Sequence, residues 1–235
     1  SFDNTDDCDT IADGSGTWEF GQGGLDAGTS NFTITAWVEL LTNVTDTNPS
    51  IYFKGAGSNS QAGYWWYYDT ADNRFELRLS DGLDADRSNP DGPVFTLDDN
   101  SWHHVAVVVQ RTASQDQATY YLDGVLQGSG TSTADAGVTT NTTERVEFGG
   151  NCSAANVDWS GRQDEIKIYS YERTAKQIVE DMNAGHPAPG SPVGSAAGYW
   201  KLDEGFGTTA QDANSLNNDL TLSTQSWSNN GKFNK

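Results

Sequence analysis

The chain contains 235 residues, 33 of them acidic and 13 basic, which gives a formal net charge of −20 at pH 7. Such an acidic surface repels polyanions, so nucleic acid and anionic membranes are excluded as main partners. No apolar run approaches the roughly 18 residues that a membrane-spanning helix needs, which argues against membrane insertion. Hydrophobic residues reach only 35%, but aromatic residues reach 11%, and their rings can fill a core. Composition therefore predicts a globular domain.

Apolar and polar residues alternate with period 2 through much of the chain, which is typical of half-buried strands. The pattern is clearest over Asn31–Leu40 and returns over Arg74–Leu79, where Glu76 and Arg78 point outward. A turn signal at Asp123-Gly124 predicts a hairpin. Further strands are expected at residues 105–109, 118–122, 145–148, 165–169, 199–202 and 220–222. The sequence thus predicts an all-β fold.

One short helix is expected near residues 174–184. Thr174 and Gln177 have the spacing of a capping box, and Gly185 suits the position after the last turn. Residues 186–197 follow, rich in proline and glycine, and are typical of a linker. The chain is therefore expected to divide into residues 1–185 and a tail, residues 198–235.

Four motifs in order carry a resemblance to a known family. They are SWHHVAV at 101–107, YLDGVL at 121–126, VEFGGN at 146–151 and GRQDEIKIY at 161–169. With the helix that follows, they resemble the laminin-G-like family of the concanavalin-A-like lectin and glucanase group. The resemblance covers most of residues 1–185. It implies a two-sheet antiparallel jelly-roll sandwich, a fold that hosts lectins, adhesins and spacer modules alike.

The tail is similar to the opening of the same family's domain. The similarity lies in GYWKLDEGFGTT at 198–209. In the family the opening runs through a Gly-Lys-Phe segment into a Ser-Phe-Asp strand, and here these segments stand at residues 231–233 and 1–3. The resemblance implies that residues 1–185 lack the opening strands and that the tail contains them.

The tail carries large apolar side chains that should not remain in water. They are Tyr199, Trp200, Leu202, Leu220, Leu222, Trp227 and Phe233. Burying the six other than Tyr199 is worth about 10 kcal/mol, most of the roughly 5–15 kcal/mol that stabilises a domain. Three arrangements would bury them: a tandem array, donation of the tail to the next copy, or closure on the chain's own sandwich. Because prolines extend the linker, we expect a head-to-tail filament of copies of this chain.

The sequence predicts no catalytic site. No strand matches the Glu-x-Asp-x-x-Glu arrangement of the laminarinase-type relatives, and no nucleophile, base and carboxylate stand in a hydrolase pattern. The resemblance does imply a Ca²⁺ ion bound by Asp164 and Asp212, with backbone carbonyls near Ser215 and Asn217 completing the oxygen shell. The alternative is that Asp212 caps a turn and Asp164 a strand end.

Three tryptophans are candidates for stacking on a glycan: Trp65, Trp66 and Trp159. Alternation over residues 65–68 instead favours one aromatic pair in the core and the other on the outer face. A monomeric carbohydrate-binding adhesin or lectin module is therefore the alternative to the filament.

Several features favour an extracellular or cell-surface location. Cys8 and Cys152 are expected to form a disulfide, the alternative being two buried thiols. Glycosylation sequons occur at Asn31, Asn43, Asn141 and Asn151.

Overall fold

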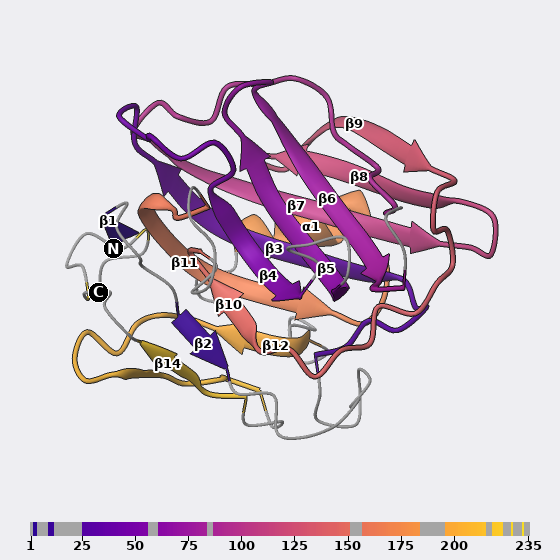
Figure 1. Cartoon of the computed structure of the whole chain (residues 1–235). Coiled ribbons are helices and arrows are strands. Elements are labelled where there is room, and N and C mark those ends of the chain that lie inside the picture. Colours follow the sequence, from indigo (N-terminus) through magenta and orange to yellow (C-terminus); the bar gives the residue numbers. More distant parts are fainter. Residues whose placement is uncertain are drawn as a thin grey trace.

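The fold is a sandwich of two antiparallel sheets, called sheet A and sheet B below. Sheet B lies in front of sheet A in the view of Figure 1. The computed structural model describes residues 2–3, 9–11, 25–55, 61–83, 87–150, 157–183, 196–214, 218–222, 227 and 232. Sheet A has the order β1 (Phe2–Asp3), β11 (Ser160–Tyr169), β3 (Phe32–Leu40), β7 (Trp102–Arg111), β8 (Asp116–Leu122) and β9 (Val125–Ser132), and β12 (Ala196–Trp200) also pairs with β11. Sheet B has the order β13 (Thr209–Ala210), β14 (Leu220–Leu222), β2 (Asp9–Ile11), β10 (Val146–Phe148), β4 (Ser50–Gly55), β5 (Ala62–Asp69) and β6 (Arg74–Asp81). The predicted all-β jelly-roll sandwich is confirmed.

Aromatic rings fill much of the space between the sheets. Trp66, Trp159 and Trp200 are fully buried in the main core, together with aliphatic residues of β3 and β7. Trp200 packs against Phe148 with ring centroids 4.9 Å apart. This composition explains how a chain with few aliphatic residues builds a core.

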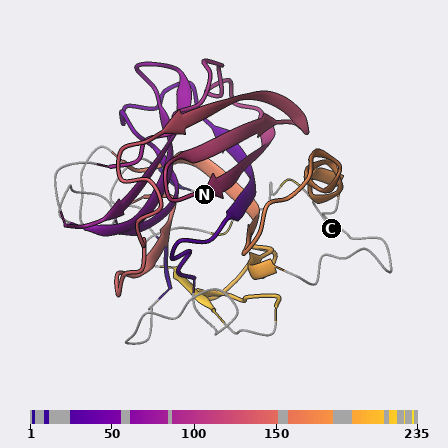
Figure 2. The ribbon, with the colours of Figure 1, turned by 90° about the vertical axis from the view of Figure 1, so that its right-hand side faces the viewer.

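The single helix among the described residues, α1 (Ala175–Asn183), confirms the predicted position. Its capping box is formed: Thr174 Oγ1 accepts the Gln177 N–H at 3.3 Å, and Gln177 Oε1 accepts the Thr174 N–H at 2.9 Å. Ile178 packs on the outer face of sheet A against Ala106 and Val108. Figure 2 shows α1 on the side of sheet A that faces away from sheet B. No helix in the described part of the chain is long and apolar enough to span a membrane.

The tail is paired within its own chain. In β12, Trp200 lies opposite Ile166 of β11, and in β14, Thr221 lies opposite Thr10 of β2. Tyr199, Trp200, Leu220 and Leu222 are buried, and Leu202 and Trp227 pack partly buried against the main core. Phe233 lies outside the described residues. Closure on the chain's own sandwich thus buries or partly buries six of the seven apolar side chains named above, and Phe206 of the tail is exposed.

Both ends of the chain lie along one edge of β11. Phe2 of β1 pairs with Gly161, and β12 pairs with residues 166–169 of the same strand. Between them, the backbone N–H of Lys232 donates to Asp164 Oδ2 at 2.9 Å. The strand β12 begins at Ala196, inside the segment that composition assigns to the linker, because Ala197 and Gly198 are buried against the sandwich.

Candidate functional site

The outer face of sheet A is covered by α1 and by buried ion pairs. Arg173 donates to both oxygens of Asp181, at 2.9 and 2.8 Å. Lys167 Nζ lies 3.4 Å from Glu165 Oε2, which also accepts the Tyr199 hydroxyl at 2.5 Å. All five side chains are almost completely buried. Each charge here has a partner of opposite sign, so this face is built for packing.

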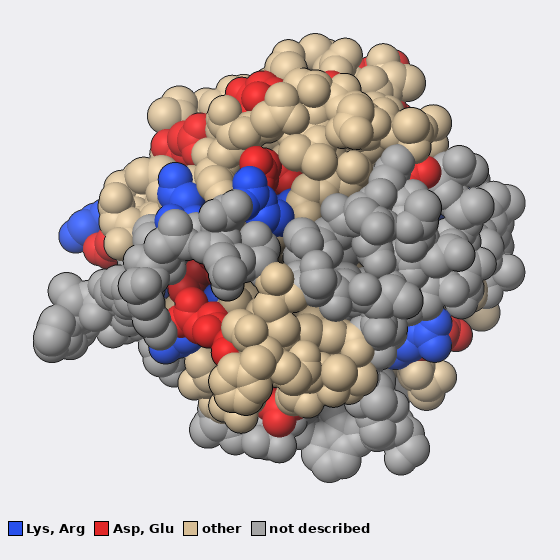
Figure 3. All heavy atoms as spheres, turned by 90° about the vertical axis from the view of Figure 1, so that its left-hand side faces the viewer, with Lys and Arg blue, Asp and Glu red and all other residues tan. Residues whose placement is uncertain are grey.

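Pairing with carboxylates is the rule for the arginines of this chain. The sequence has seven arginines, and five of them form ion pairs: Arg74, Arg111, Arg145, Arg162 and Arg173. On the face shown in Figure 3, the blue basic atoms likewise lie beside red acidic ones. The remaining two, Arg78 and Arg87, form no ion pair with any residue that the structure describes.

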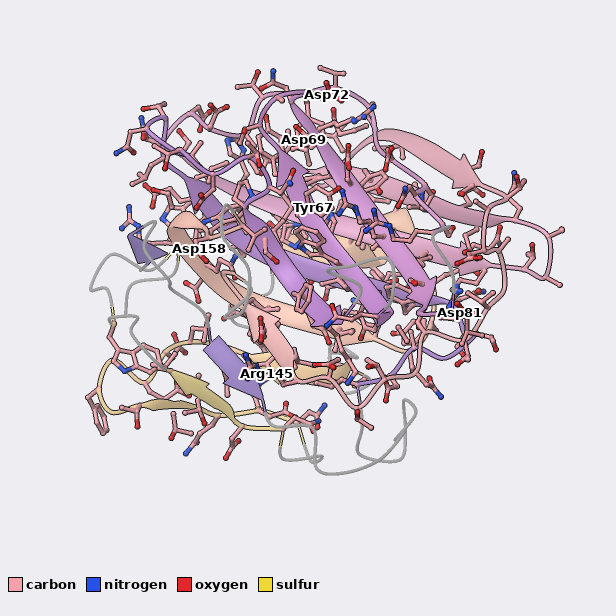
Figure 4. All side chains as sticks on the ribbon, viewed as in Figure 1. Tyr67, Asp69, Asp72, Asp81, Arg145 and Asp158 are labelled. Carbon is pink, nitrogen blue, oxygen red and sulfur yellow. The ribbon has the colours of Figure 1, made fainter. Side chains whose placement is uncertain are left out.

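The outer face of sheet B carries a second apolar cluster, separate from the main core. It consists of Phe53 on β4, Trp65 and Tyr67 on β5, and Val157. Their neighbours Trp66 and Tyr68 point to the opposite side, into the main core, because side chains alternate along a strand. The Trp65 and Tyr67 rings lie 4.2 Å apart between centroids. In Figure 4, Tyr67 lies over the middle of β5 on the face toward the viewer.

One arginine lies on this aromatic cluster and a second lies near it. Arg78 of β6 is the strand partner of Trp65, and its guanidinium carbon lies 4.9 Å from the ring centroids of both Trp65 and Tyr67. Arg87 precedes Ser88, whose backbone pairs with Leu79 on the side of β6 that faces away from β5. Burial lowers the pKa of Arg87, and the positive charge of Arg78 lowers it further. Two guanidinium groups are therefore close enough to repel each other.

Acidic residues lie at the β5–β6 turn, at the upper end of this face (Figure 4). Asp69, Asp72 and Glu76 place one oxygen each within 4.8 Å of one another, a spacing that could hold a metal ion. Arg74, however, already lies 2.8 Å from Asp72 Oδ2 and 3.1 Å from Glu76 Oε1. The Arg74 guanidinium already supplies the positive charge that a metal ion would bring. We therefore infer that this acidic cluster stabilises the β5–β6 turn. Burial and the charge of Glu76 raise the pKa of nearby Asp91 to about 6.

Two of the three predicted stacking tryptophans lie in the main core. Trp66 and Trp159 are 0% exposed, and the indole N–H of Trp159 donates to the Glu39 carbonyl at 2.9 Å. Neither ring has a face open to a ligand. Trp65 is on the outer face, as the alternation allowed, but only 3% exposed, with Arg78 over its ring. A ligand on this face would meet the arginine first, with the aromatic rings beneath it.

Both aspartates of the expected calcium site accept hydrogen bonds from the chain's own N–H groups. Asp212 Oδ1 accepts the N–H groups of Tyr199 and Asn214, both at 3.0 Å. Its Oδ2 accepts the backbone and side-chain N–H groups of Asn218, at 3.1 and 3.4 Å. Four donors fill the acceptor positions of this carboxylate, so Asp212 does not fit a calcium ligand in this arrangement.

The other expected ligand, Asp164, accepts the N–H groups of Glu165 and Lys232, at 3.0 and 2.9 Å. Burial raises its pKa to about 7. Ser215 and Asn217 lie outside the described residues. Calcium binding by Asp164 and Asp212 stays untested, and the four hydrogen bonds that Asp212 accepts argue against it.

The predicted glycosylation sites differ in their surroundings. Asn31 is held by its amide: Nδ2 donates to Glu172 at 2.6 Å, and Oδ1 accepts the Arg111 N–H at 2.7 Å. Asn43 is exposed in a turn, and Asn141 is half-buried. Asn151 and both cysteines of the predicted disulfide, Cys8 and Cys152, lie outside the described residues. Asn43 is therefore the most accessible of the three described sequons.

The sheet order, the single helix and the strand register define a lectin-like jelly roll. The family model of the concanavalin A-like lectin/glucanases superfamily matches residues 12–179. The chain belongs to this family. A search of the curated proteins found no match.

Solved structures share the fold at low identity. A proposed carbohydrate-binding protein from Bacteroides ovatus is 18% identical with a TM-score of 0.57; the match covers 95% of this chain and 62% of that protein. A pentraxin from Limulus polyphemus is 15% identical with a TM-score of 0.46, over 74% of this chain and 81% of that one. A sialidase carbohydrate-binding module from Ruminococcus gnavus is 15% identical with a TM-score of 0.44, over 65% and 83%. The chain thus spans about three fifths of the Bacteroides protein.

Proposed function

We propose that the chain is a non-catalytic carbohydrate-binding module that acts outside the cell, and that the outer face of β4, β5 and β6 is its binding face. The similarity of fold to a proposed carbohydrate-binding protein supports the class. The observation that carries the proposal is the aromatic cluster outside the main core, with Arg78 over its rings and forming no ion pair with a carboxylate in the described part of the chain.

The chemistry of this face suits a sugar. Saccharides present apolar C–H groups beside hydroxyls, so their sites combine aromatic surface with a few polar groups in fixed positions. Trp65 and Tyr67 form a buried aromatic base beneath Arg78, and the partly exposed Arg78 supplies the hydrogen-bond donors that a ligand meets first. The Trp65 indole is fixed from behind by its hydrogen bond to Ser50 Oγ at 3.1 Å, and Tyr67 donates to Glu76. The rings are therefore held in place before a ligand arrives.

Binding of the intact chain to a panel of immobilised glycans tests the proposal. We expect at least one glycan to bind. The substitutions Trp65→Ala and Arg78→Gln should each weaken this binding about tenfold or more; for Arg78, one lost charge-assisted contact is worth roughly 1.5–3 kcal/mol. Arg162→Gln is the matched control, because Arg162 also lies over a tryptophan, 5.5 Å from the Trp102 centroid, but pairs with Glu39. Circular dichroism confirms that each variant is folded. Absence of binding to every glycan would contradict the proposal.

The head-to-tail filament expected from sequence is the competing interpretation, and nothing yet tests it. Its driving force was the apolar surface of the tail, and that surface is covered within one chain by pairing of β12 with β11 and of β14 with β2. A filament would require these strands to be exchanged between copies. Sedimentation of the chain over a range of concentrations tests this: we expect a monomer, and long fibres would restore the first interpretation.

A further inference from the structure

The two unpaired arginines indicate which chemical group the binding face takes. In a chain of net charge −20, carboxylate partners are abundant, and five of the seven arginines have found one. Arg78 and Arg87 form no ion pair with a described residue, and the backbone pairing of Ser88 with Leu79 brings the segment that carries Arg87 alongside Arg78 on β6. Two like charges side by side, partly buried, are costly unless something negative joins them. The part of the chain that the structure describes contains no such group bound to either of them.

We propose that this face binds an acidic saccharide, with a carboxylate or sulfate of the sugar held between Arg78 and Arg87. The inference rests on the proposed function and names the ligand class for the same face.

Arg78 is oriented before the ligand binds. Its guanidinium lies between two aromatic contacts, 4.9 Å from the centroids of both Trp65 and Tyr67, which fixes its position above the sheet. A guanidinium has five N–H donors, and none on Arg78 or Arg87 donates to a described residue. Planar guanidinium groups hold a carboxylate through two parallel hydrogen bonds. The donors an anion needs are thus present and free.

The acidic residues nearby form their ion pairs with Arg74. Asp91 feels the charge of Arg78, but its ion-pair contact is to Arg74, at 4.0 Å. Glu76 is held by Arg74 and by the Tyr67 hydroxyl. Arg78 and Arg87 are thus left without an ion pair among the described residues. Since the rest of the protein repels anions, binding at this pair should be selective and weakened by salt.

The experiment compares matched ligands on the intact chain by titration calorimetry. A galacturonate oligomer is the acidic probe, its fully methyl-esterified form the neutral control, and a sulfated oligosaccharide the second anion. We expect the acidic or sulfated probe to bind at least tenfold more tightly than the ester, and affinity to fall with added salt. Preference between the two anions identifies the acidic group.

Variants locate the binding to the arginine pair. Arg78→Gln and Arg87→Gln should each reduce affinity for the acidic probe about tenfold or more, while Arg162→Gln should not. Arg78→Lys keeps the charge over the rings but loses the two parallel hydrogen bonds, so an intermediate loss of affinity is expected. Because this variant is conservative, a graded loss would show that the effect does not come from misfolding. Equal affinity for acid and ester would overturn the inference and leave the proposed function intact. Binding to an acidic peptide but to no saccharide would overturn both.

Discussion

Both outer faces of the sandwich carry an arginine, but the positive charges of the two arginines are paired in different ways. On sheet A, Arg173 is locked to Asp181 by two hydrogen bonds and covered by α1. On sheet B, Arg78 lies on aromatic rings and forms no ion pair with a carboxylate among the residues that the structure describes. A buried charge with its partner built in serves the fold, whereas a charge without a described partner is available to a ligand. Pairing therefore distinguishes the structural face from the binding face.

The largest expected effect comes from removing the C-terminal tail, which contributes a strand to each sheet. A chain ending at residue 185 loses β12 from sheet A and β14 from sheet B. It also loses the buried side chains of Trp200, Leu220 and Leu222, each worth roughly 1.5–3 kcal/mol. Since a whole domain is stable by about 5–15 kcal/mol, we expect no cooperative thermal unfolding, measured by circular dichroism.

A peptide of residues 196–235 added in trans is the control for this truncation. It should restore a cooperative transition, because β12 and β14 pair with body strands that remain present. A truncated chain that unfolds cooperatively without the peptide would show that the body is a complete domain.

The next effect contrasts the two faces directly. Asp181→Ala leaves the guanidinium of Arg173 buried and unpaired, which should lower the free energy of unfolding by about 3–5 kcal/mol. Arg87→Gln on sheet B removes a charge that repels its neighbour, so we expect a change within about 1 kcal/mol, neutral or stabilising. Urea unfolding of both variants checks the contrast. Equal losses would mean that Arg87 has a structural role.

The sequence predicted the strands whose outer-face residues are polar better than β4, whose outer-face residue Phe53 is apolar. Alternation marked β6 and placed Arg78 outward, and it marked β3 although all nine of its residues are buried. It missed β4, because Phe53 on the outer face is as apolar and buried as Ile51 and Tyr52. Apolar residues on both faces remove the period-2 signal.

The group that a side chain contacts was harder to predict than the direction in which the side chain points. The sequence showed that Trp200 and Leu220 must be buried, but the same strand pairing can be made with the chain's own body or with a copy. Likewise, Arg78 could be placed outward from local alternation, whereas its lack of a carboxylate depends on the register of β6 against β5 and on where residues 87–91 run. Both questions are tertiary, so a single sequence does not answer them.

A substitution at Asp212 tests whether a carboxylate that accepts four hydrogen bonds stabilises the fold. Asp212→Asn replaces one acceptor oxygen with a donor that clashes with backbone N–H groups of the tail, so the free energy of unfolding should fall by about 2 kcal/mol. Thermal unfolding of the wild-type chain should not change when a calcium chelator is added. A drop in melting temperature on chelation would instead return calcium to this end of the sandwich.

The smallest expected effect is a pH dependence at the start of β7, where two neighbouring histidines differ. His103 Nδ1 lies 2.8 Å from Asp123 Oδ2, and its Nε2 lies 3.2 Å from the Asp99 carboxylate. The hydrogen bond to Asp123, followed by that to Asp99, raises the pKa of His103. His104 is buried against Trp37, and burial lowers its pKa to about 3, so it stays neutral at physiological pH.

Because the pKa of His103 is higher in the folded chain than the unfolded value near 6.5, its stabilising contribution is complete below that value and is lost as pH rises through the raised pKa. The pair is partly exposed, so the contribution should be about 1 kcal/mol or less. Melting temperatures of the wild-type chain and of His103→Gln, measured from pH 5 to pH 9, isolate this term, because Asp91 and Asp164 titrate in both proteins. The difference between them should shrink toward high pH; a constant difference would mean that the aspartates hold His103 only in its neutral form.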